Sequence, residues 1–600
     1  MINPHCYFYA TIDIFLKTSE SDILASLKTG SEKLYKKAVE ESQITAWKDE
    51  ISVLEKTVID LPHNWIIILE YILPREAGRR PDVILLTGKE ILVLEFKQFE
   101  EEHWSHIDQV IGYTRDLREY QSYCHNKEVI PFLILTKTQN KEKKYKNVQV
   151  LSSEKLPDYL FRYKNEIEQI DPLLFLEGKY QPLPTIIEAA KTIFNREPLP
   201  QIKSAKSSKI DETLAFLQDK ADEALEKHQN LLMLVTGVPG AGKTLVGLQF
   251  AFNNSSRKAV LLSGNRPLIE VLQSIFGKAS TNLVHNVLDD YNKNPKLIPN
   301  EAIIIYDEAQ RAWDEKQSKK LGRDCSEPED LIRLVKRRSE NGEGTVLVGL
   351  IGEGQAIYLG EEAGIEQWNN AIKGSDLKWQ IFCPTHLASY FEQPITKEEL
   401  NLSVSLRSKS ALQLPNWIEA VLAGDSQKAK KIYGTICNEF PIHITRKFNE
   451  AKEYLKNRYE RESSKLYGVI ISSQACNYNR YEVDKDLKLI GVGKDDLGPW
   501  FSEKSCCQLN KYITEFQAQG LELDFPLICW GSDFSWDGEK WCLRFANDYI
   551  NGQLTDPFLI RQNAYRVLLS RGREGMFIFV PNKFIMNETY DFLKKCLGKN

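Results

Sequence analysis

The sequence predicts an α/β protein with parallel sheets, and three apolar runs in the middle of the chain lead to this fold class. The first run, residues 231–235, leads into a glycine-rich loop and then into apolar residues at helical spacing. The second run, residues 301–306, ends in two adjacent carboxylates, and the third spans residues 345–351. Apolar runs of this length, separated by helical segments, are typical of strands buried between layers of helices.

Composition limits the classes of protein to consider. A chain of 600 residues is too long for one hydrophobic core, so we expect three or four domains. The net charge of −5 excludes a global basic excess but allows a local basic groove. The eleven cysteines include no C-x-x-C pair, which favours reduced thiols over a zinc site. The chain begins without a signal-peptide pattern, and no apolar run approaches the roughly 20 residues of a membrane span. We therefore expect a cytoplasmic protein without a membrane partner.

The glycine-rich loop has the spacing of a phosphate-binding P-loop. Gly237, Gly240 and Gly242 let the backbone curl so that successive N–H groups point at one phosphate. Lys243 would bridge the β- and γ-phosphates, and the Thr244 hydroxyl would hold Mg²⁺. The strand before the loop and the helix after it supply the context that this motif needs. We predict that the protein binds ATP with Mg²⁺.

The two carboxylates after the second apolar run complete this predicted nucleotide site. Asp307 would hold the Mg²⁺ through water, and Glu308 would orient and deprotonate the attacking water. Adjacent carboxylates at the end of an apolar strand are costly without a cation, which disfavours a purely structural role. Gln355, shortly after the third strand, would hydrogen-bond the γ-phosphate.

The N-terminal part contains a predicted β-hairpin with charged ends. Residues 66–73 form one strand-like run, and residues 81–97 form two β-rich halves around Gly88. Asp82 stands at the start of the first half, and Glu95 and Lys97 stand at the end of the second. Side chains two apart on a strand point to the same face. Asp82 and Glu95 would hold one or two Mg²⁺ ions, which would lower the pKa of a bound water. Lys97 would orient that water or stabilise the charge on a scissile phosphate.

This arrangement resembles the PD-(D/E)XK nucleases. Gln109 and Tyr113 lie one helical turn apart downstream and resemble the Q-x-x-x-Y element of RecB-type nucleases in that superfamily. The resemblance implies a metal-dependent nuclease domain in which these two residues belong to the catalytic site. Nucleases of this kind also carry an acidic residue on an earlier element. Glu70 and Glu76 are both candidates for it, and the sequence does not choose between them.

The rest of the chain resembles superfamily 1 helicases. Residues 307–310 together with Gln355 are similar to motifs II and III, although Gly-Glu-Gly-Gln stands where Gly-Asp-x-x-Gln is usual. Arg407 matches motif IV, whose arginine contacts the nucleotide, and residues 514–522 resemble motif V. Arg571 matches the motif VI arginine, which reaches across the cleft to the γ-phosphate.

Taken together, the motifs resemble a bacterial fusion of a PD-(D/E)XK nuclease with a superfamily 1 helicase of the Schlafen-like ATPase group. We expect a PD-(D/E)XK domain over residues 1–165 and a linker or helical connector over residues 166–225. Two RecA-like P-loop motor domains would follow, over residues 226–395 and 396–600. The resemblance also implies a role in defence against phages.

The predicted function is ATP-dependent movement along a nucleic acid, DNA rather than RNA, combined with Mg²⁺-dependent cleavage of phosphodiester bonds. Trp530 and Trp536 would stack on the bases of the bound strand. In one alternative, the protein is an ATP-gated nucleic-acid sensor whose nuclease domain is latent. In another, the first domain only binds and has lost cleavage. A homo-oligomer or a partner protein is compatible with each alternative.

Overall fold

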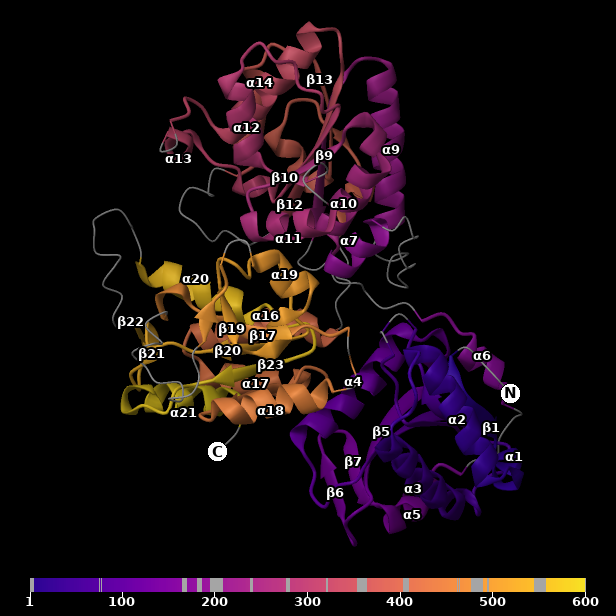
Figure 1. The fold of residues 1–600 in the computed structure, drawn as a ribbon. Helices are drawn as coiled ribbons and strands as arrows, with labels where there is room; N and C mark the ends of the chain where they lie inside the picture. The colour runs from indigo at the N-terminus through magenta and orange to yellow at the C-terminus, as the bar shows by residue number, and fades with distance from the viewer. Residues whose placement is uncertain are drawn as a thin grey trace.

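The computed structural model shows three α/β units joined by connecting segments (Figure 1). We name them the N-terminal unit (residues 5–180), the middle unit (residues 209–402) and the C-terminal unit (residues 409–598). The structure describes residues 5–74, 76, 78–164, 170–180, 186–194, 209–237, 241–276, 281–319, 322–352, 364–402, 409–460, 462, 464–475, 489–493, 496–543 and 557–598. The mixed α/β class with parallel sheets is confirmed.

The N-terminal unit contains a seven-stranded mixed sheet with the order β1-β2-β3-β4-β5-β7-β6. The strands β1 to β4 are antiparallel neighbours, β4, β5 and β7 are parallel, and β6 is antiparallel to β7. The strands are β1 (Cys6–Thr11), β2 (Ile66–Tyr71), β3 (Val83–Leu86), β4 (Glu90–Lys97), β5 (Glu128–Leu135), β6 (Glu142–Tyr145) and β7 (Val148–Ser152). The helices are α1 (Ile12–Lys17), α2 (Glu20–Tyr35), α3 (Glu41–Val58), α4 (Trp104–Tyr120), α5 (Leu156–Phe161) and α6 (Pro172–Leu176).

The hairpin predicted from residues 81–97 is confirmed by the pairing of β3 with β4. Val83 lies opposite Leu94 and Leu86 opposite Ile91, and Gly88 in the turn has a φ of 92°. A positive φ of this size favours glycine because it has no Cβ. All of β3 and the apolar part of β4 are buried, so both faces of the hairpin are covered.

The middle unit contains an eight-stranded sheet in which every described pair is parallel. Its order is β10-β9-β11-β12-β8-β13-β14, with β15 also pairing with β8. The strands are β8 (Asn230–Gly237), β9 (Val260–Ser263), β10 (Thr281–Leu283), β11 (Ile303–Asp307), β12 (Thr345–Gly352), β13 (Trp379–Cys383), β14 (Ile395–Thr396) and β15 (Asn401–Leu402). The helices are α9 (Ile210–Glu226), α10 (Lys243–Asn253), α11 (Arg266–Phe276), α12 (Val284–Lys293), α13 (Glu315–Lys319), α14 (Glu327–Glu340) and α15 (Glu366–Lys373).

The edges of this unit differ from the ranges expected from the sequence. The strands β14 and β15 extend the sheet to Leu402, past the expected boundary at residue 395. Helix α9, which falls in the expected connector, packs on α10, β8 and β12. Helix α7 (Ile186–Phe194) packs on α10 and α11. Short strands and amphipathic helices of this kind belong to a unit because of their contacts with distant segments, which local sequence patterns do not reveal.

The C-terminal unit has a six-stranded sheet with the order β16-β23-β20-β17-β19-β18, and its described pairs are parallel. The strands are β16 (Ile442–Thr445), β17 (Tyr467–Ile471), β18 (Ile490–Gly491), β19 (Lys511–Thr514), β20 (Phe525–Cys529) and β23 (Met576–Phe579), with a separate hairpin of β21 (Phe534–Trp536) and β22 (Trp541–Leu543). The helices are α16 (Lys409–Leu422), α17 (Ser426–Ile436), α18 (Phe448–Arg458), α19 (Leu497–Ser502), α20 (Pro557–Leu569) and α21 (Asn587–Cys596).

The three units pack on one another through specific helices. The N-terminal unit has a hydrophobic core of its own, whereas one apolar cluster runs from the middle unit into the C-terminal unit. Helix α11 packs on α19, where a Cβ at Gly498 would lie 2.9 Å from the Cβ of Ser274. Helix α4 packs on α18, so the N-terminal unit docks on the C-terminal unit (Figure 1).

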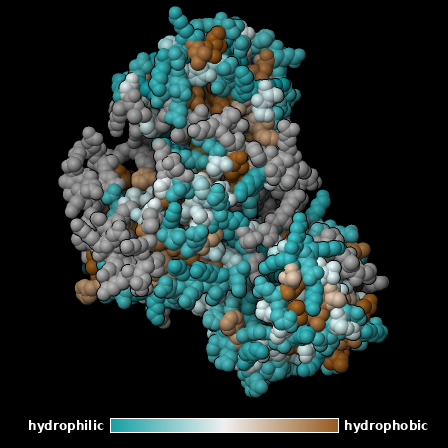
Figure 2. Space-filling model, viewed as in Figure 1, coloured by the Kyte–Doolittle hydropathy of each residue, from teal (hydrophilic) through white to brown (hydrophobic). Residues whose placement is uncertain are grey.

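Hydrophilic residues cover most of the coloured part of the face drawn in Figure 2, with smaller hydrophobic patches between them. Within the described ranges, every helix is too short or too polar to cross a bilayer.

Candidate functional site

The strand and the helix that flank the predicted phosphate-binding loop are both present. Strand β8 is fully buried and ends at Gly237, and α10 begins at Lys243. Gly242 caps the helix with a φ of 91°, a conformation that side chains rarely adopt. The Lys243 ammonium donates to the Gly237 carbonyl at 2.7 Å. Gly240 lies outside the described residues.

Thr244 and Asp307 meet at the carboxyl ends of β8 and β11. The Thr244 hydroxyl lies 3.3 Å from each carboxylate oxygen of Asp307. Burial, and then the charge of Glu308, raise the pKa of Asp307 to about 7, while Lys243 acts in the opposite direction. A buried carboxylate of this kind favours a nearby cation, because the cation replaces the lost solvation. The Thr244 hydroxyl and the Asp307 carboxylate therefore fit a Mg²⁺ site beside the loop.

Glu308 is held in a strained backbone conformation. Its φ is 56°, in the left-handed region that non-glycine residues seldom occupy. The Gln310 side-chain NH₂ group donates to the Glu308 carboxylate, and the Gly352 N–H donates to the side-chain oxygen of Gln310 at 2.9 Å. Arg311 lies 3.6 Å from the same carboxylate. Gln310 therefore positions Glu308, a role that becomes visible only when β11 and β12 are adjacent.

Arg571 approaches this site from the C-terminal unit. It follows α20, and its guanidinium donates to the carbonyls of Val567 at 3.1 Å and of Ala518 at 3.3 Å. Burial, and then repulsion by Arg311, lower the pKa of Arg571 to about 10, and the charge of Glu308 opposes them. Arg571 is thus close enough to interact electrostatically with Glu308 and Arg311 of the middle unit. Gln355 and Arg407 lie outside the described residues.

In the N-terminal unit, Asp82, Glu95 and Lys97 lie together at one end of the β3–β4 hairpin. The Asp82 carboxylate accepts a hydrogen bond from the Phe96 N–H at 2.8 Å. The Lys97 ammonium lies 2.8 Å from the Glu95 carboxylate. Asp82 and Glu95 are both buried. The structure therefore brings the three charged residues that the sequence singled out to one place.

Helix α4 brings Gln109 and Tyr113 to the same place. The Gln109 amide donates to the Tyr113 hydroxyl at 3.0 Å, and both side chains are buried. Burial raises the pKa of Tyr113 well above its ordinary value, and the charges of Glu95 and Asp82 raise it further. Both carboxylates therefore lie within electrostatic reach of the tyrosine hydroxyl.

The two candidates for an additional acidic residue are both engaged in ion pairs. The Glu70 carboxylate accepts from the Trp47 indole at 2.6 Å and pairs with Arg80. The Glu76 carboxylate lies 3.1 Å from the ammonium of Lys465 in the C-terminal unit. Glu70 thus supports the sheet, and Glu76 belongs to an interdomain contact.

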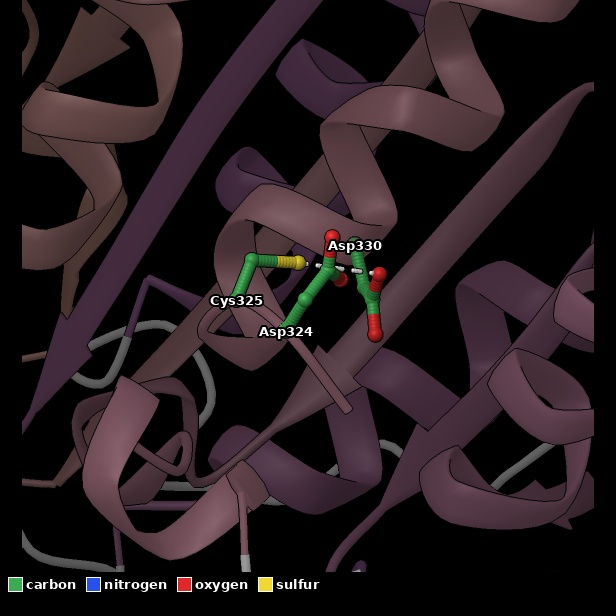
Figure 3. A group of neighbouring side chains, drawn as sticks. All are labelled: Asp324, Cys325 and Asp330. Carbon is green, nitrogen blue, oxygen red and sulfur yellow. Dashed lines mark hydrogen bonds between the residues drawn. The ribbon is translucent and has the colours of Figure 1, made fainter. Parts of the chain in front are cut away.

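Another group of potential metal ligands lies on the middle unit, away from these sites. Asp324, Cys325 and Asp330 form the one such group of three found in the described part of the chain (Figure 3). The Cys325 thiol donates to Asp330 at 3.1 Å, and Arg333 donates to Asp324 at 2.9 Å. Burial, and then the bond to Asp330, raise the pKa of the Cys325 thiol well above its ordinary value. A protonated thiol beside an arginine explains the group without a metal.

The expectation that Trp530 and Trp536 stack on nucleic-acid bases is wrong. Trp530 is fully buried, and its indole donates to the Phe534 carbonyl at 2.7 Å. Trp536 stacks on Phe592 with ring centroids 4.1 Å apart. Both tryptophans belong to the core around β21 and β22. Phe516, in the segment that resembles motif V, is instead 42% exposed.

Comparison with known proteins identifies the family. The sequence model of Schlafen group 3, DNA/RNA helicase domain, matches residues 230–582. The chain belongs to this family. The match begins at β8 and ends just after β23, so this Schlafen group 3 match includes both parallel sheets and leaves the N-terminal unit outside. Membership supports binding and hydrolysis of ATP by a helicase-like domain.

Solved structures of helicases also match. The helicase domain of Hef from Pyrococcus furiosus shows 12% identity over 63% of this chain and 97% of that chain, with a TM-score of 0.25. Dbp5 from S. cerevisiae, bound to RNA and ADP BeF3, shows 14% identity over 65% of this chain and 92% of that chain, with a TM-score of 0.28. No curated protein matches the sequence. The family assignment therefore rests on the Schlafen group 3 match.

The buried carboxylate of Asp307 leads to a prediction about stability and pH. The raised pKa means that the protonated form stabilises the nucleotide-free fold at acidic pH. This contribution is lost as the pH rises from about 4, the ordinary Asp value, to about 7. Asp307→Asn should therefore raise the melting temperature by about 3 °C or more at pH 8, and by less at pH 5.

The measurement is thermal unfolding of the nucleotide-free protein at both pH values. Asp219→Asn, which changes an exposed carboxylate on α9, serves as the control and should have little effect. An Asp307→Asn effect of equal size at pH 5 and pH 8 would contradict the assignment of a destabilising buried charge.

Proposed function

We propose that this Schlafen group 3 protein is an ATP-driven nucleic-acid helicase or translocase with a Mg²⁺-dependent nuclease at its N-terminus. The observation that carries the proposal is the convergence of Thr244, Asp307, Glu308 and Arg571 between two parallel sheets. Two units that share one nucleotide site can change their separation when the nucleotide is hydrolysed. DNA is the preferred substrate in this proposal, with a cytoplasmic role in defence against phages.

In the proposed motor reaction, each residue acts on ATP in a separate way. The backbone N–H groups after Gly237 and the Lys243 ammonium hold the phosphates once Lys243 leaves its carbonyl partner. Thr244 and Asp307 would hold Mg²⁺, which would neutralise charge on the phosphate oxygens. Glu308, positioned by Gln310, takes the proton of the attacking water. Arg571 stabilises the charge that develops on the γ-phosphate.

Gln355 and Arg407 are proposed as further contacts to the nucleotide, on the strength of their resemblance to motifs III and IV. Their places in the chain support this role, since Gln355 follows β12 and Arg407 precedes α16. The glutamine would report the γ-phosphate to the neighbouring unit, and the arginine would contact the nucleotide from the C-terminal side.

In the proposed nuclease reaction, the buried end of the β3–β4 hairpin is the cutting site. Asp82 and Glu95 would hold Mg²⁺, which would lower the pKa of a water bound there. Lys97 orients that water or stabilises the phosphate charge after it separates from Glu95. The hydrogen bond between Gln109 and Tyr113, one turn apart on helix α4, orients the tyrosine hydroxyl toward the two carboxylates in this proposal.

One observation favours a second candidate function, an ATP-gated sensor with a latent nuclease. The Lys97 ammonium is paired with Glu95, and Arg571 is bound to backbone carbonyls, so each cation is occupied by groups of this chain. A protein in this arrangement would bind nucleic acid and nucleotide first and would cut only after a rearrangement.

Lys243→Ala tests the nucleotide site. Loss of the ammonium that contacts the phosphates should lower ATP hydrolysis by about 10²-fold or more without a change in melting temperature. Steady-state phosphate release with single-stranded DNA or RNA present is the measurement, and Lys293→Ala at the exposed end of α12 is the matched control. ATP hydrolysis that persists in Lys243→Ala at the control level would refute the assignment.

Asp82→Ala and Lys97→Ala test the nuclease site. Each should reduce Mg²⁺-dependent cleavage of labelled DNA by about 10²-fold or more and should leave ATP hydrolysis within about twofold of wild type. Lys89→Ala, in the exposed turn of the same hairpin, is the control for the local change. If the wild type and both variants all cleave DNA, the assignment of the nuclease site is wrong. If the wild type does not cleave DNA, the result favours the latent sensor.

A further inference from the structure

The turn between α20 and β23 carries two charged residues with different surroundings. Arg571 lies at its start and is influenced by Glu308 and Arg311 of the middle unit. Glu574 lies at its end and is buried on the side of the N-terminal unit. Only two residues, Gly572 and Arg573, therefore separate the residue at the candidate nucleotide site from the residue at the interface between the N-terminal and C-terminal units.

The Glu574 carboxylate is surrounded by cations of two units. Its Oε1 lies 2.7 Å from the Lys465 ammonium and 3.3 Å from the Arg115 guanidinium, and its Oε2 accepts from the Tyr459 hydroxyl at 3.1 Å. Burial alone would raise the pKa of Glu574, but Lys465 and Arg115 bring it well below its ordinary value. The carboxylate is therefore ionised and held from several directions.

Arg115 is the contact that comes from the N-terminal unit. It lies on helix α4, is buried, and also pairs with Asp116 at 2.7 Å. Asp116 in turn pairs with Arg79, whose guanidinium lies 4.9 Å from the centre of the Tyr113 ring. A continuous set of contacts thus leads from Glu574 through Arg115, Asp116 and Arg79 to the Tyr113 ring.

The turn itself is tightly fixed to the segment before β20. The Leu523 N–H donates to the Arg571 carbonyl at 3.0 Å, and the Glu574 N–H donates to the Asp524 carbonyl at 2.9 Å. At Gly575, a Cβ would lie 2.3 Å from the Phe525 ring, so the chain passes close to β20. Because both ends of the turn are bonded to the same segment, a shift at Glu574 moves the backbone of Arg571.

We propose that Glu574 is a positioning residue for ATP hydrolysis, and that Arg115 of the N-terminal unit holds it so that Arg571 meets the γ-phosphate. The N-terminal unit is then a working part of the ATPase and not only a neighbour of it. This inference rests on the role proposed for Arg571. It does not depend on nuclease activity.

The test is steady-state ATP hydrolysis of the full chain, with single-stranded DNA and RNA oligonucleotides, by wild type, Arg115→Met, Arg115→Lys, Arg571→Ala and the double variant Arg115→Met/Arg571→Ala. Arg115→Met should lower kcat about tenfold or more, because a small displacement of a charged group lowers the rate steeply. The KM for ATP should stay within about twofold, since Arg571 acts in the transition state. Arg115→Lys should restore part of kcat.

Arg118→Ala is the matched control. Arg118 lies on the same helix and bonds Glu439 of the C-terminal unit at 2.7 Å, but it has no described contact with Glu574. Its kcat should stay within about twofold of wild type. The double variant should be no slower than Arg571→Ala alone, because both changes affect one interaction.

The outcomes separate the two proposals. Full activity in Arg571→Ala would overturn the role of Arg571 and, with it, the positioning role of Glu574. A large loss in Arg571→Ala with a wild-type kcat in Arg115→Met would overturn the positioning role alone, and so would a change confined to KM. If Arg115→Met does not fold, Arg115→Lys is judged by the same changes in kcat and KM. The proposal then also requires that amide exchange of residues 566–576 be faster in Arg115→Lys than in wild type.

Discussion

The candidate nucleotide site depends on the burial of a carboxylate at the end of a parallel strand. Asp307 ends a buried apolar strand, and its carboxylate lies beside the Thr244 hydroxyl and the charges of Glu308 and Lys243. Ionisation there is unfavourable until a cation arrives, which links the charge state of the site to what occupies it. The left-handed backbone at Glu308 adds strain next to that charge. Together they make the end of β11 the least relaxed part of an otherwise well-packed sheet.

Charged side chains are also buried at the interface between the N-terminal and C-terminal units, but there they are compensated by ion pairs within the chain. Arg79, Arg115, Lys465 and Glu574 are all buried, and each charge is compensated by an opposite charge. Buried ion pairs of this kind gain little net stability because desolvation offsets the attraction. They do select one geometry, since any other arrangement leaves a charge unpaired. The interface therefore defines orientation more than it adds binding energy.

Local patterns predicted the elements but not their long-range partners. The strands ending at Gly237 and Asp307, and the β3–β4 hairpin around Gly88, follow from apolar runs and turn residues, and each is present. The sequence also singled out Asp82, Glu95 and Tyr113, which the structure brings together. In contrast, the contact of Gln310 with Gly352 and that of Arg115 with Glu574 join distant segments. Trp530 and Trp536 were misjudged because an aromatic side chain has the same appearance in a sequence whether it is buried or exposed.

The docking of α4 on α18 determines which parts of the molecule travel together. Asp108 of α4 bonds His443 and Tyr454, and these contacts join the N-terminal unit to the C-terminal unit. In the proposed motor cycle, the hairpin end with Asp82 and Glu95 would therefore move with the C-terminal unit relative to the middle unit. A strand bound by the middle unit would then pass the hairpin by one increment in every proposed cycle, so that step size and cutting interval would have a common origin.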